Sequence, residues 1–294
     1  MHEKEAKSIL SAQNGMNIYR GCTHGCIYCD ARSACYRMNH DFEDVEVKSN
    51  AAELLEYTLK RKRTKCMIAT GAMSDPYQPC EEKLGLTRKC LEIVDKYGFG
   101  LSIQTKSDLV LRDLDILKSI NSRTRCIVQL TMTTYDEKLC GILEPDVCTT
   151  KRRAEVLNIL RDNGIPAIVW LTPVLPFIND TEENLRGILE YCIEAEVYGI
   201  VTFGIGLTLR EGDREYFYQK LDEHFPGMKQ KYMDTYGDAY ELPVPEEEER
   251  KRYIHETCVN YHIQDDTGKL FTYMHAFVDR EAGEQLSLFD LAKL

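Results

Sequence analysis

Three cysteines in one short stretch are the residues whose type and spacing point most clearly to chemistry. Cys22, Cys26 and Cys29 lie in GCTHGCIYCDAR, with three and then two residues between them. Cysteine thiolates are the usual ligands of iron–sulfur clusters, and the common electron-transfer clusters use four of them. Three thiolates without a fourth cysteine at a matching spacing would hold three irons of a cubane cluster and leave the fourth iron without a protein ligand. The spacing therefore predicts a cluster that binds a further molecule.

A structural zinc site is the alternative interpretation of these cysteines. Zinc takes four tetrahedral ligands, commonly from two CxxC-type pairs or a mixture of Cys and His. His24 and Cys35 are nearby candidates for a fourth ligand, but no second pair follows downstream. The spacing also differs from the usual zinc patterns, so the sequence favours the cluster.

The bulk composition predicts a cytoplasmic globular protein. The chain has 294 residues and 43% hydrophobic residues, which is ordinary for a soluble protein. No run approaches the length needed to cross a bilayer, and the charged start MHEKEAKSILSAQNG lacks the apolar core of a signal peptide. Scattered thiols and an oxidation-sensitive cluster indicate a reducing compartment. We expect no contact with a membrane.

The net charge of −11 argues against a surface that coats nucleic acid over its whole extent. Two basic runs stand out, residues 60–63 with Lys65 and residues 151–153. Cations favour helix C-termini, so we interpret both runs as solvated helix ends.

Apolar, β-branched runs alternate with amphipathic stretches along the first two thirds of the chain. The expected strands are residues 17–20, 66–70, 101–106, 126–133, 167–173 and 200–204. The expected helices between them are residues 51–60, 87–97, 109–120, 149–163 and 181–197. Strands flanked by helices of this length indicate βαβ units and a parallel sheet. The sequence therefore predicts a parallel α/β fold.

The pattern changes beyond about residue 207. Residues 216–225 and 245–262 are expected to be helical, separated by connections rich in Gly and Tyr. We predict a mostly helical C-terminal extension over residues 207–280 and a flexible tail over residues 281–294.

The CxxxCxxC spacing is that of radical S-adenosylmethionine (SAM) enzymes, and the chain resembles that superfamily. The branch it resembles is the spore photoproduct lyase-like one, the DNA repair photolyases of the radical SAM type. YRGCTHGCIYCDAR, SDPYQP, TKS and PVLPFIND carry this resemblance over residues 17–206. It implies a partial (β/α)6 TIM-type barrel over residues 1–206, a [4Fe–4S] cluster and SAM. It also implies reductive cleavage of SAM to a 5′-deoxyadenosyl radical and an electron donor such as flavodoxin or ferredoxin.

The resemblance also implies roles for particular residues. Cys22, Cys26 and Cys29 would ligate the cluster and, with Tyr28, form the catalytic set. Ligand groups of a parallel barrel lie at the C-terminal ends of its strands, where several candidates fall. The expected SAM contacts are Tyr28 beside the adenine, Gly71 at the amino group, Lys106 at the carboxylate, Gln129 and Thr131 at the ribose, and Leu171 and Gly204 around the adenine. Ser74 is expected to contact SAM as well.

Two departures from spore photoproduct lyases affect the hydrogen-return step. Those enzymes carry a hydrogen-donating cysteine where this chain has Ala72, and a tyrosine directly after the third cluster cysteine, where it has Asp30. A methyl group has no weak S–H bond to offer, so the thymine-dimer reaction by that route is not expected. Cys80 follows the same loop, and we interpret it as a buried spectator thiol.

A second motif lies near the end of the chain. Gln285, Leu286, Leu288 and Phe289 resemble the short motif by which bacterial repair and replication proteins dock on the sliding clamp of DNA polymerase. Its apolar side chains would fill a pocket on the clamp while the glutamine makes polar contacts. The alternative is that these residues pack a terminal element onto the barrel.

Three functions remain open from the sequence. The first is a radical SAM enzyme that acts on DNA and is tethered to the clamp. The second is a radical SAM enzyme that modifies a peptide, a protein or RNA. The third is a zinc or redox module in which the cysteines only hold the fold.

Overall fold

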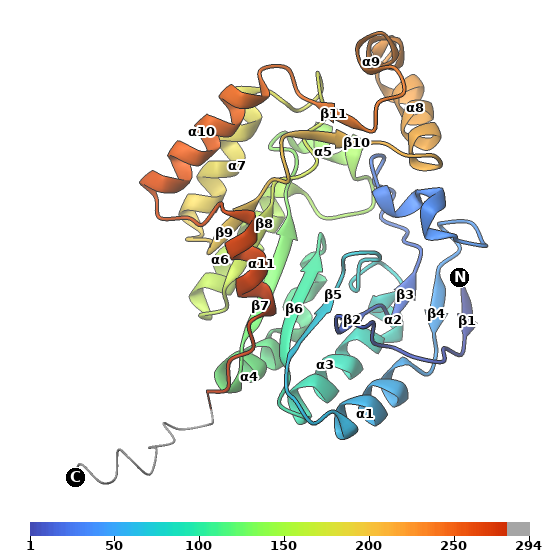
Figure 1. The fold of residues 1–294 in the computed structure, drawn as a ribbon, viewed down its shortest axis with the longest axis vertical. Coiled ribbons are helices and arrows are strands. Elements are labelled where there is room, and N and C mark those ends of the chain that lie inside the picture. Colours follow the sequence, from blue (N-terminus) through green and yellow to red (C-terminus); the bar gives the residue numbers. More distant parts are fainter. Residues whose placement is uncertain (281–294) are drawn as a thin grey trace.

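A six-stranded parallel sheet forms the centre of the molecule, for which a computed structural model describes residues 1–280 (Figure 1). The strands in spatial order are β2 Gly15–Met16, β5 Met67–Thr70, β6 Gly100–Thr105, β7 Cys126–Thr131, β8 Ala167–Trp170 and β9 Gly199–Val201. Every neighbouring pair is parallel. Spatial order follows chain order, with β2 at one edge and β9 at the other. The described sheet is thus the open, partial TIM-type barrel that was predicted.

Helices connect the successive strands, as the alternating pattern predicted. They are α1 Ala51–Arg61, α2 Glu81–Leu84, α3 Leu86–Lys96, η3 Asp108–Asp113, α4 Leu114–Arg123, α5 Glu137–Leu143, α6 Thr150–Asp162 and α7 Glu182–Glu194. Side-chain caps define two of the starts. The hydroxyl of Thr149 accepts a hydrogen bond from the Arg152 amide at 3.3 Å, and that of Thr181 from the Asn184 amide at 3.2 Å.

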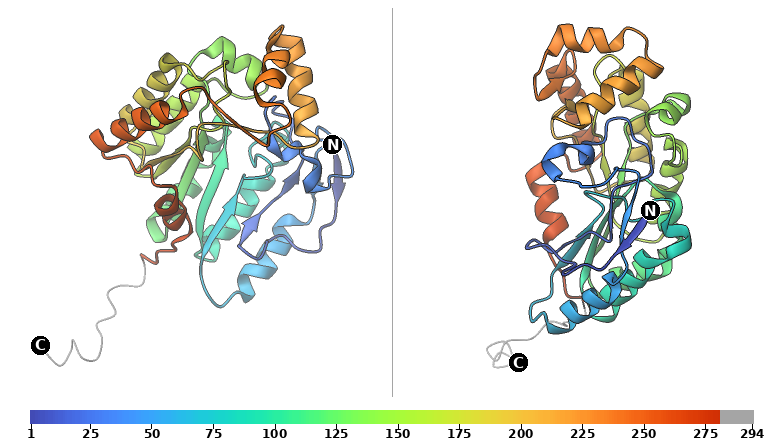
Figure 2. Two further views of the ribbon diagram at one scale, coloured as in Figure 1. Left: turned by 45° about the horizontal axis from the view of Figure 1, so that its top comes forward. Right: turned by 90° about the vertical axis from the view of Figure 1, so that its right-hand side faces the viewer.

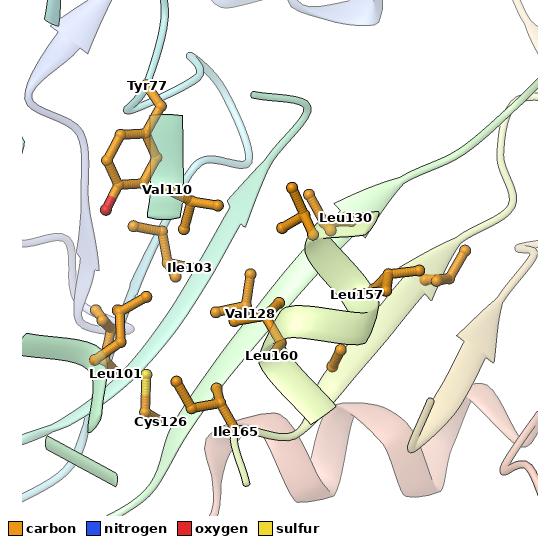
Figure 3. Packing of buried hydrophobic residues seen from close by; sticks show 14 of the residues in the cluster. Tyr77, Leu101, Ile103, Val110, Cys126, Val128, Leu130, Leu157, Leu160 and Ile165 are labelled. Atoms are coloured by element: carbon orange, nitrogen blue, oxygen red, sulfur yellow. The ribbon is translucent and has the colours of Figure 1, made fainter. Parts of the chain in front are cut away.

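The two faces of the sheet have different partners because side chains alternate along a strand. Leu101, Ile103, Val128 and Leu130 point toward the helices and pack in the main apolar core (Figure 3). Figure 3 shows residues 157 and 160 of α6 on the same side. The opposite, inner face carries polar side chains such as Ser102 and Gln129, which are hydrogen-bonded to each other at 2.8 Å. The inner face thus carries polar as well as apolar side chains.

The N-terminal region differs from the prediction. The expected strand over residues 17–20 is present in part, but it does not belong to the barrel, whose first strand is β2. Tyr19–Arg20 forms β3, which pairs antiparallel with β4 Glu46–Lys48, and β1 His2–Lys4 completes a separate three-stranded sheet in the order β1-β4-β3. Strands of two or three residues are too short to show a periodic pattern. Two short helices, η1 Asp30–Arg32 and η2 Ala34–Tyr36, follow the cysteines.

The C-terminal region completes the barrel and covers its upper end. It contains β10 Gly206–Thr208, α8 Asp213–His224, α9 Met228–Tyr236, β11 Glu241–Pro243, α10 Glu247–Asn260 and α11 Thr267–His275. Both views of Figure 2 place α8 and α9 beside the N-terminal segment that carries the cysteines. Helix α10 packs against α7, and Leu270 and Met274 of α11 fill the inner face of the sheet beside Ile127 and Ile168. The domain division at residue 206 stays a prediction.

Two further expectations concern the surface and the tail. Lys60 and Arg61 occupy the last turn of α1, as expected for the first basic run. Among the described helices, none combines the length and the apolar character that a transmembrane span requires. The predicted clamp motif lies in residues 281–294, outside the described residues.

Candidate active site

A cavity of about 970 Å³ opens at the C-terminal ends of the barrel strands. Parallel barrels carry their active sites at this end. Nine of the predicted residues line the cavity: Cys22, Cys26, Tyr28, Cys29, Gly71, Ser74, Lys106, Thr131 and Gly204. Two others, Gln129 and Leu171, are not part of its lining. The structure therefore brings most of the expected residues into one site.

The cysteine loop is held by backbone contacts to segments far along the chain. The amide of Cys22 donates to the carbonyl of Phe42 at 3.1 Å, and the amide of Ile27 donates to that of Leu143 at 3.0 Å. Gly21 has φ +90°, and a β-carbon there would lie 2.4 Å from the Phe42 carbonyl oxygen. A glycine is required at this approach, so the loop conformation is specified by its own sequence.

Burial governs the chemistry of the three thiols. It raises the pKa of Cys22 to about 12 and raises the pKa of Cys26 and of Cys29 as well. Without metal the thiols therefore keep their protons at neutral pH. Iron binds thiolate, so cluster assembly releases those protons, and the affinity for metal rises with pH.

The spacing of the ligand atoms argues against a zinc site. Among residues 1–280, no three of Cys22, His24, Cys26 and Cys29 have ligand atoms all within 4.8 Å of one another. A tetrahedral zinc with bonds of about 2.3 Å brings its sulfur ligands to about 3.8 Å from one another. Cys35, the other candidate ligand, is exposed and is not part of the cavity lining. A [4Fe–4S] cluster holds its thiolates further apart than a zinc ion does, so the absence of a tight group does not count against a cluster.

His24 is a polar group that the structure leaves without a hydrogen-bond partner. His24 lies between Cys22 and Cys26 in the sequence, is 3% exposed and lines the cavity. Neither ring nitrogen has a hydrogen-bond partner, and the nearest carboxylate oxygen, of Asp75, lies 3.8 Å from Nε2. A buried polar group of this kind needs a partner. A bound group with acceptor atoms in the cavity would supply one.

Gly71 and Ser74 follow β5 and hold the backbone beside the cysteine loop. Gly71 has φ +102°, and a β-carbon there would lie 1.9 Å from the Gln104 carbonyl oxygen. The close approach at Gly71 is therefore one between two strand ends. The hydroxyl of Ser74 donates to the Gly21 carbonyl and accepts from the Gln78 amide at 3.2 Å. Ser74 thus fixes the cysteine loop, and a contact between Ser74 and SAM stays a prediction.

Lys106 presents an unpaired cation to the cavity. Its backbone amide donates to Asp75 Oδ2 at 2.8 Å, while its ammonium nitrogen lies 5.9 Å from the centroid of the Tyr28 ring. No carboxylate of the described residues forms an ion pair with this ammonium group. Burial acts to lower the pKa of Lys106, but the acidic groups around it, Cys26 in its thiolate form and Glu144 among them, outweigh burial and raise the pKa. The group is therefore charged at neutral pH and suits an anionic ligand.

A buried ion pair behind the site was missed from the sequence. Tyr28 donates its hydroxyl proton to Glu144, and Glu144 pairs with Arg153, whose side chain is 0% exposed. Arg153 also donates to the Thr131 carbonyl at 2.7 Å. The expectation that residues 151–153 form a solvated helix end holds for Lys151 and Arg152, at the start of α6, but is wrong for Arg153, which is buried. An arginine inside a charge run gives no sequence signal of burial.

Two predicted SAM contacts are corrected. Leu171 is 0% exposed and packs in the core on the helix side of the sheet, so it does not face the cavity. Gln129 lies on the inner face, but its amide donates to Ser102 at 2.8 Å and its carbonyl accepts from the Trp170 indole at 2.7 Å. Its role is to hold Trp170, which does line the cavity.

Aromatic and charged side chains form the mouth of the cavity, which was also missed. Arg210 donates to the Tyr240 hydroxyl at 2.6 Å and lies 3.4 Å from Asp30. Tyr36 donates to Asp30 at 2.7 Å. Phe203 also lines the cavity and is 58% exposed. These residues come from separate segments of the chain, and no local motif joins them.

The absence of a hydrogen-donating cysteine from the loop after β5 stays a prediction. Ala72 lines the cavity at the position where the resemblance places that thiol. Cys80 packs against the apolar core and is not part of the cavity lining, as expected for a spectator.

Comparison with known proteins agrees with this geometry. Residues 16–192 match the model of the Radical SAM superfamily. The uncharacterized protein Rv2578c of Mycobacterium tuberculosis is 29% identical over 257 residues, covering 85% of this chain and 75% of that protein. The uncharacterized protein MJ0683 of Methanocaldococcus jannaschii is 36% identical over 176 residues, covering 59% and 65%. A solved structure of spore photoproduct lyase complexed with dinucleoside spore photoproduct has a TM-score of 0.63 at 12% identity, covering 88% of this chain and 78% of that one.

The chain belongs to the radical SAM superfamily. Its cofactors are accordingly a [4Fe–4S] cluster and SAM, and its chemistry needs an electron donor. The site fits both groups, because three spaced thiols stand at one end of a cavity that also contains an unpaired cation and a partnerless histidine. When bound, the reduced cluster and SAM supply a 5′-deoxyadenosyl radical that abstracts hydrogen from a substrate. The protein's own part is to position the thiols, to offer the Lys106 charge and to enclose the site.

Proposed function

We propose that this radical SAM enzyme acts on DNA and takes a nucleotide base into the mouth of its cavity. The observation that carries the proposal is the pairing of a large cavity with an aromatic, arginine-bearing mouth. Ligand pockets span about 300–1,000 Å³. The cavity, at about 970 Å³, lies at the upper end of that range and has room for SAM and a further planar group.

The mouth has the chemistry of a base-stacking site. The ring centroid of Phe203 lies 5.3 Å from that of Trp170. The guanidinium of Arg210 lies 5.0 Å from the centroid of the Tyr240 ring. Stacking of bases on aromatic side chains contributes about 1–3 kcal/mol per base and tolerates any sequence. An exposed phenylalanine beside a cavity is therefore well suited to hold a base.

The charges at the mouth favour a base over a phosphate. Asp30 lies 3.4 Å from Arg210, and Glu247 lies 2.9 Å from Lys251, so the cations at the mouth have acidic partners. Phosphate binding depends on unpaired cations. The phosphates of a bound strand would accordingly stay outside while a neutral base enters. The similarity of fold to spore photoproduct lyase supports the same substrate class, and the clamp motif at residues 285–289 would add proximity to DNA.

Deuterium transfer tests the proposal. Anaerobically reconstituted enzyme is incubated with SAM, reductant and DNA deuterated at the thymine methyl and sugar positions, with and without ultraviolet damage. We expect deuterium in the 5′-deoxyadenosine formed, and none with the Cys26→Ala variant. Efficient cleavage of SAM with no label from any DNA, together with label from a deuterated peptide or RNA, would reject DNA as the substrate.

A further inference from the structure

We propose that His2, His40 and Glu46 form a second metal site that binds Zn²⁺, separate from the cysteine cluster. Within residues 1–280, these are the three metal-ligand side chains whose ligand atoms all lie within 4.8 Å of one another. His2 begins β1 and Glu46 begins β4, and the two residues are paired in register in the N-terminal sheet. His40 comes from the loop that precedes β4. A metal here would join three segments.

The hydrogen bonds of the two histidines leave the right atoms free. His40 Nδ1 lies 2.9 Å from the carbonyl oxygen of Asp41, which can only accept, so Nδ1 carries the proton. Its Nε2 is then a lone-pair donor, and this atom is buried without a hydrogen-bond partner. His2 Nδ1 lies 2.9 Å from Asp44 Oδ2 in the same way. Its Nε2 faces Glu46 Oε2 at 3.9 Å.

This pattern is the one that metal-binding histidines show. Such histidines almost always donate their other ring N–H to a carboxylate or a backbone carbonyl, which fixes the tautomer and orients the ring. Asp44 and the Asp41 carbonyl play those parts for His2 and His40. Two imidazoles and one carboxylate are an established ligand set for zinc, with water in the fourth position. Glu46, with a side chain 6% exposed, supplies the charge.

Lys4 occupies part of the site as the structure stands. Its ammonium donates to Glu46 Oε2 at 2.8 Å, while the lysine side chain is 53% exposed. An exposed lysine can swing into solvent at small cost, and the incoming cation then replaces the ammonium charge beside Glu46. Lys4 therefore acts as a competitor of the metal. Its removal should strengthen metal binding, a result that a purely structural ion pair would not give.

Metal binding at this site would also affect the cysteine loop. The loop that carries His40 continues to Phe42, whose carbonyl oxygen accepts the Cys22 amide. A cation fixed between His40, His2 and Glu46 would tie this loop to the N-terminal sheet. We expect the metal to stabilise the N-terminal segment that lines the cofactor site.

The test uses the untagged full-length holoenzyme, with its iron–sulfur cluster reconstituted, and Zn²⁺ alone as the probe. Zinc content per chain is measured after desalting, affinity by competition with a chromophoric chelator, and the ligand shell by X-ray absorption at the zinc edge. We expect one zinc per chain with nitrogen and oxygen ligands and no sulfur. His40→Ala and Glu46→Gln should each weaken affinity at least tenfold, and Asp44→Asn about 10- to 100-fold. Lys4→Gln should tighten it.

His255→Ala is the matched control. His255 also pairs with a carboxylate, that of Asp265, at 2.6 Å, but it belongs to no group of three metal-ligand side chains among residues 1–280. Its zinc affinity should equal that of the parent. Unchanged iron content in each variant shows that the fold is intact. A zinc shell containing sulfur, absence of zinc after incubation, or affinity unaltered by both His40→Ala and Glu46→Gln would overturn the proposal.

Discussion

Glu144 and Arg153 form an ion pair that is closed to solvent, with side chains 1% and 0% exposed. The pair lies behind the cofactor cavity and reaches it through Tyr28, whose hydroxyl donates to Glu144. Arg153 continues the network to the Thr131 carbonyl at the end of β7. The end of β7 and the aromatic residue of the cysteine loop thus share one buried charge pair. The pair positions the site without entering it.

Replacement of Glu144 by Gln should destabilise the protein strongly. Loss of one partner of a buried pair leaves the other charge uncompensated, which costs about 3–5 kcal/mol. Glu155→Gln, on the same helix as Arg153, is the control, because Glu155 is 51% exposed and its pair with Arg152 lies at the surface. Surface pairs contribute about 0–1 kcal/mol. Urea unfolding of both variants at equal cluster content measures the difference, and equal losses would contradict the role of the buried pair.

The same pair predicts an acid limit to stability. Burial acts to raise the pKa of Glu144, but the charges of Arg153 and Lys106 outweigh it and lower the pKa below its ordinary value. A carboxyl with a lowered pKa in the folded state stabilises that state above the unfolded pKa, about 4.3, and loses this contribution as the pH falls through the folded pKa.

The stability difference between the parent and Glu144→Gln should therefore be the same at pH 7 and pH 6. It should shrink at pH values below about 4. Urea unfolding across this range provides the measurement. A difference that already shrinks between pH 7 and pH 6 would show that another group is responsible.

The parallel sheet could be predicted because its strands are apolar runs separated by long amphipathic helices. The cysteine spacing likewise predicted the cofactor. The expected strand ends after β5 and β6 predicted that Gly71 and Lys106 lie at the cavity. Each of these signals is local, so it survives in the linear sequence. Short elements carry no such periodicity, so β2 was missed and β3 was assigned to the barrel instead of the N-terminal sheet.

What the sequence did not show depends on distant contacts. In the sequence, Arg153 cannot be distinguished from a surface cation. Only the packing of α6 places it beside Glu144. Leu171 follows a strand whose alternation decides its direction, and a one-residue change in strand position reverses the face. Arg210 and Tyr36 meet at the mouth from segments far apart in the chain.

Lys106→Met should weaken SAM binding while the iron content stays unchanged. The substitution keeps most of the side-chain volume and removes the unpaired cation of the cavity. A hydrogen bond to a charged group contributes about 1.5–3 kcal/mol, which corresponds to about a 10- to 100-fold change in affinity. Equilibrium binding of SAM to the reconstituted enzyme measures the effect.

Lys251→Met is the control for that variant, because Lys251 also lines the cavity but already pairs with Glu247 at 2.9 Å. Its affinity for SAM should stay within about twofold of the parent, since a cation already paired with a carboxylate attracts an anionic ligand less strongly. Equal effects of the two substitutions would remove the assigned role of Lys106.

Gly71→Ala should abolish the site, whereas Gly85→Ala should be tolerated. Both glycines have positive φ, +102° and +59°, so both alanines bear the cost of a left-handed backbone, about 1–2 kcal/mol. At Gly85 no atom lies within 4 Å of the added β-carbon, but at Gly71 the Gln104 carbonyl oxygen would lie at 1.9 Å. Backbone at this contact cannot move without separating β5 from β6. Urea unfolding and iron content should therefore distinguish the two variants, and equal behaviour would show that the strand ends do not need this contact.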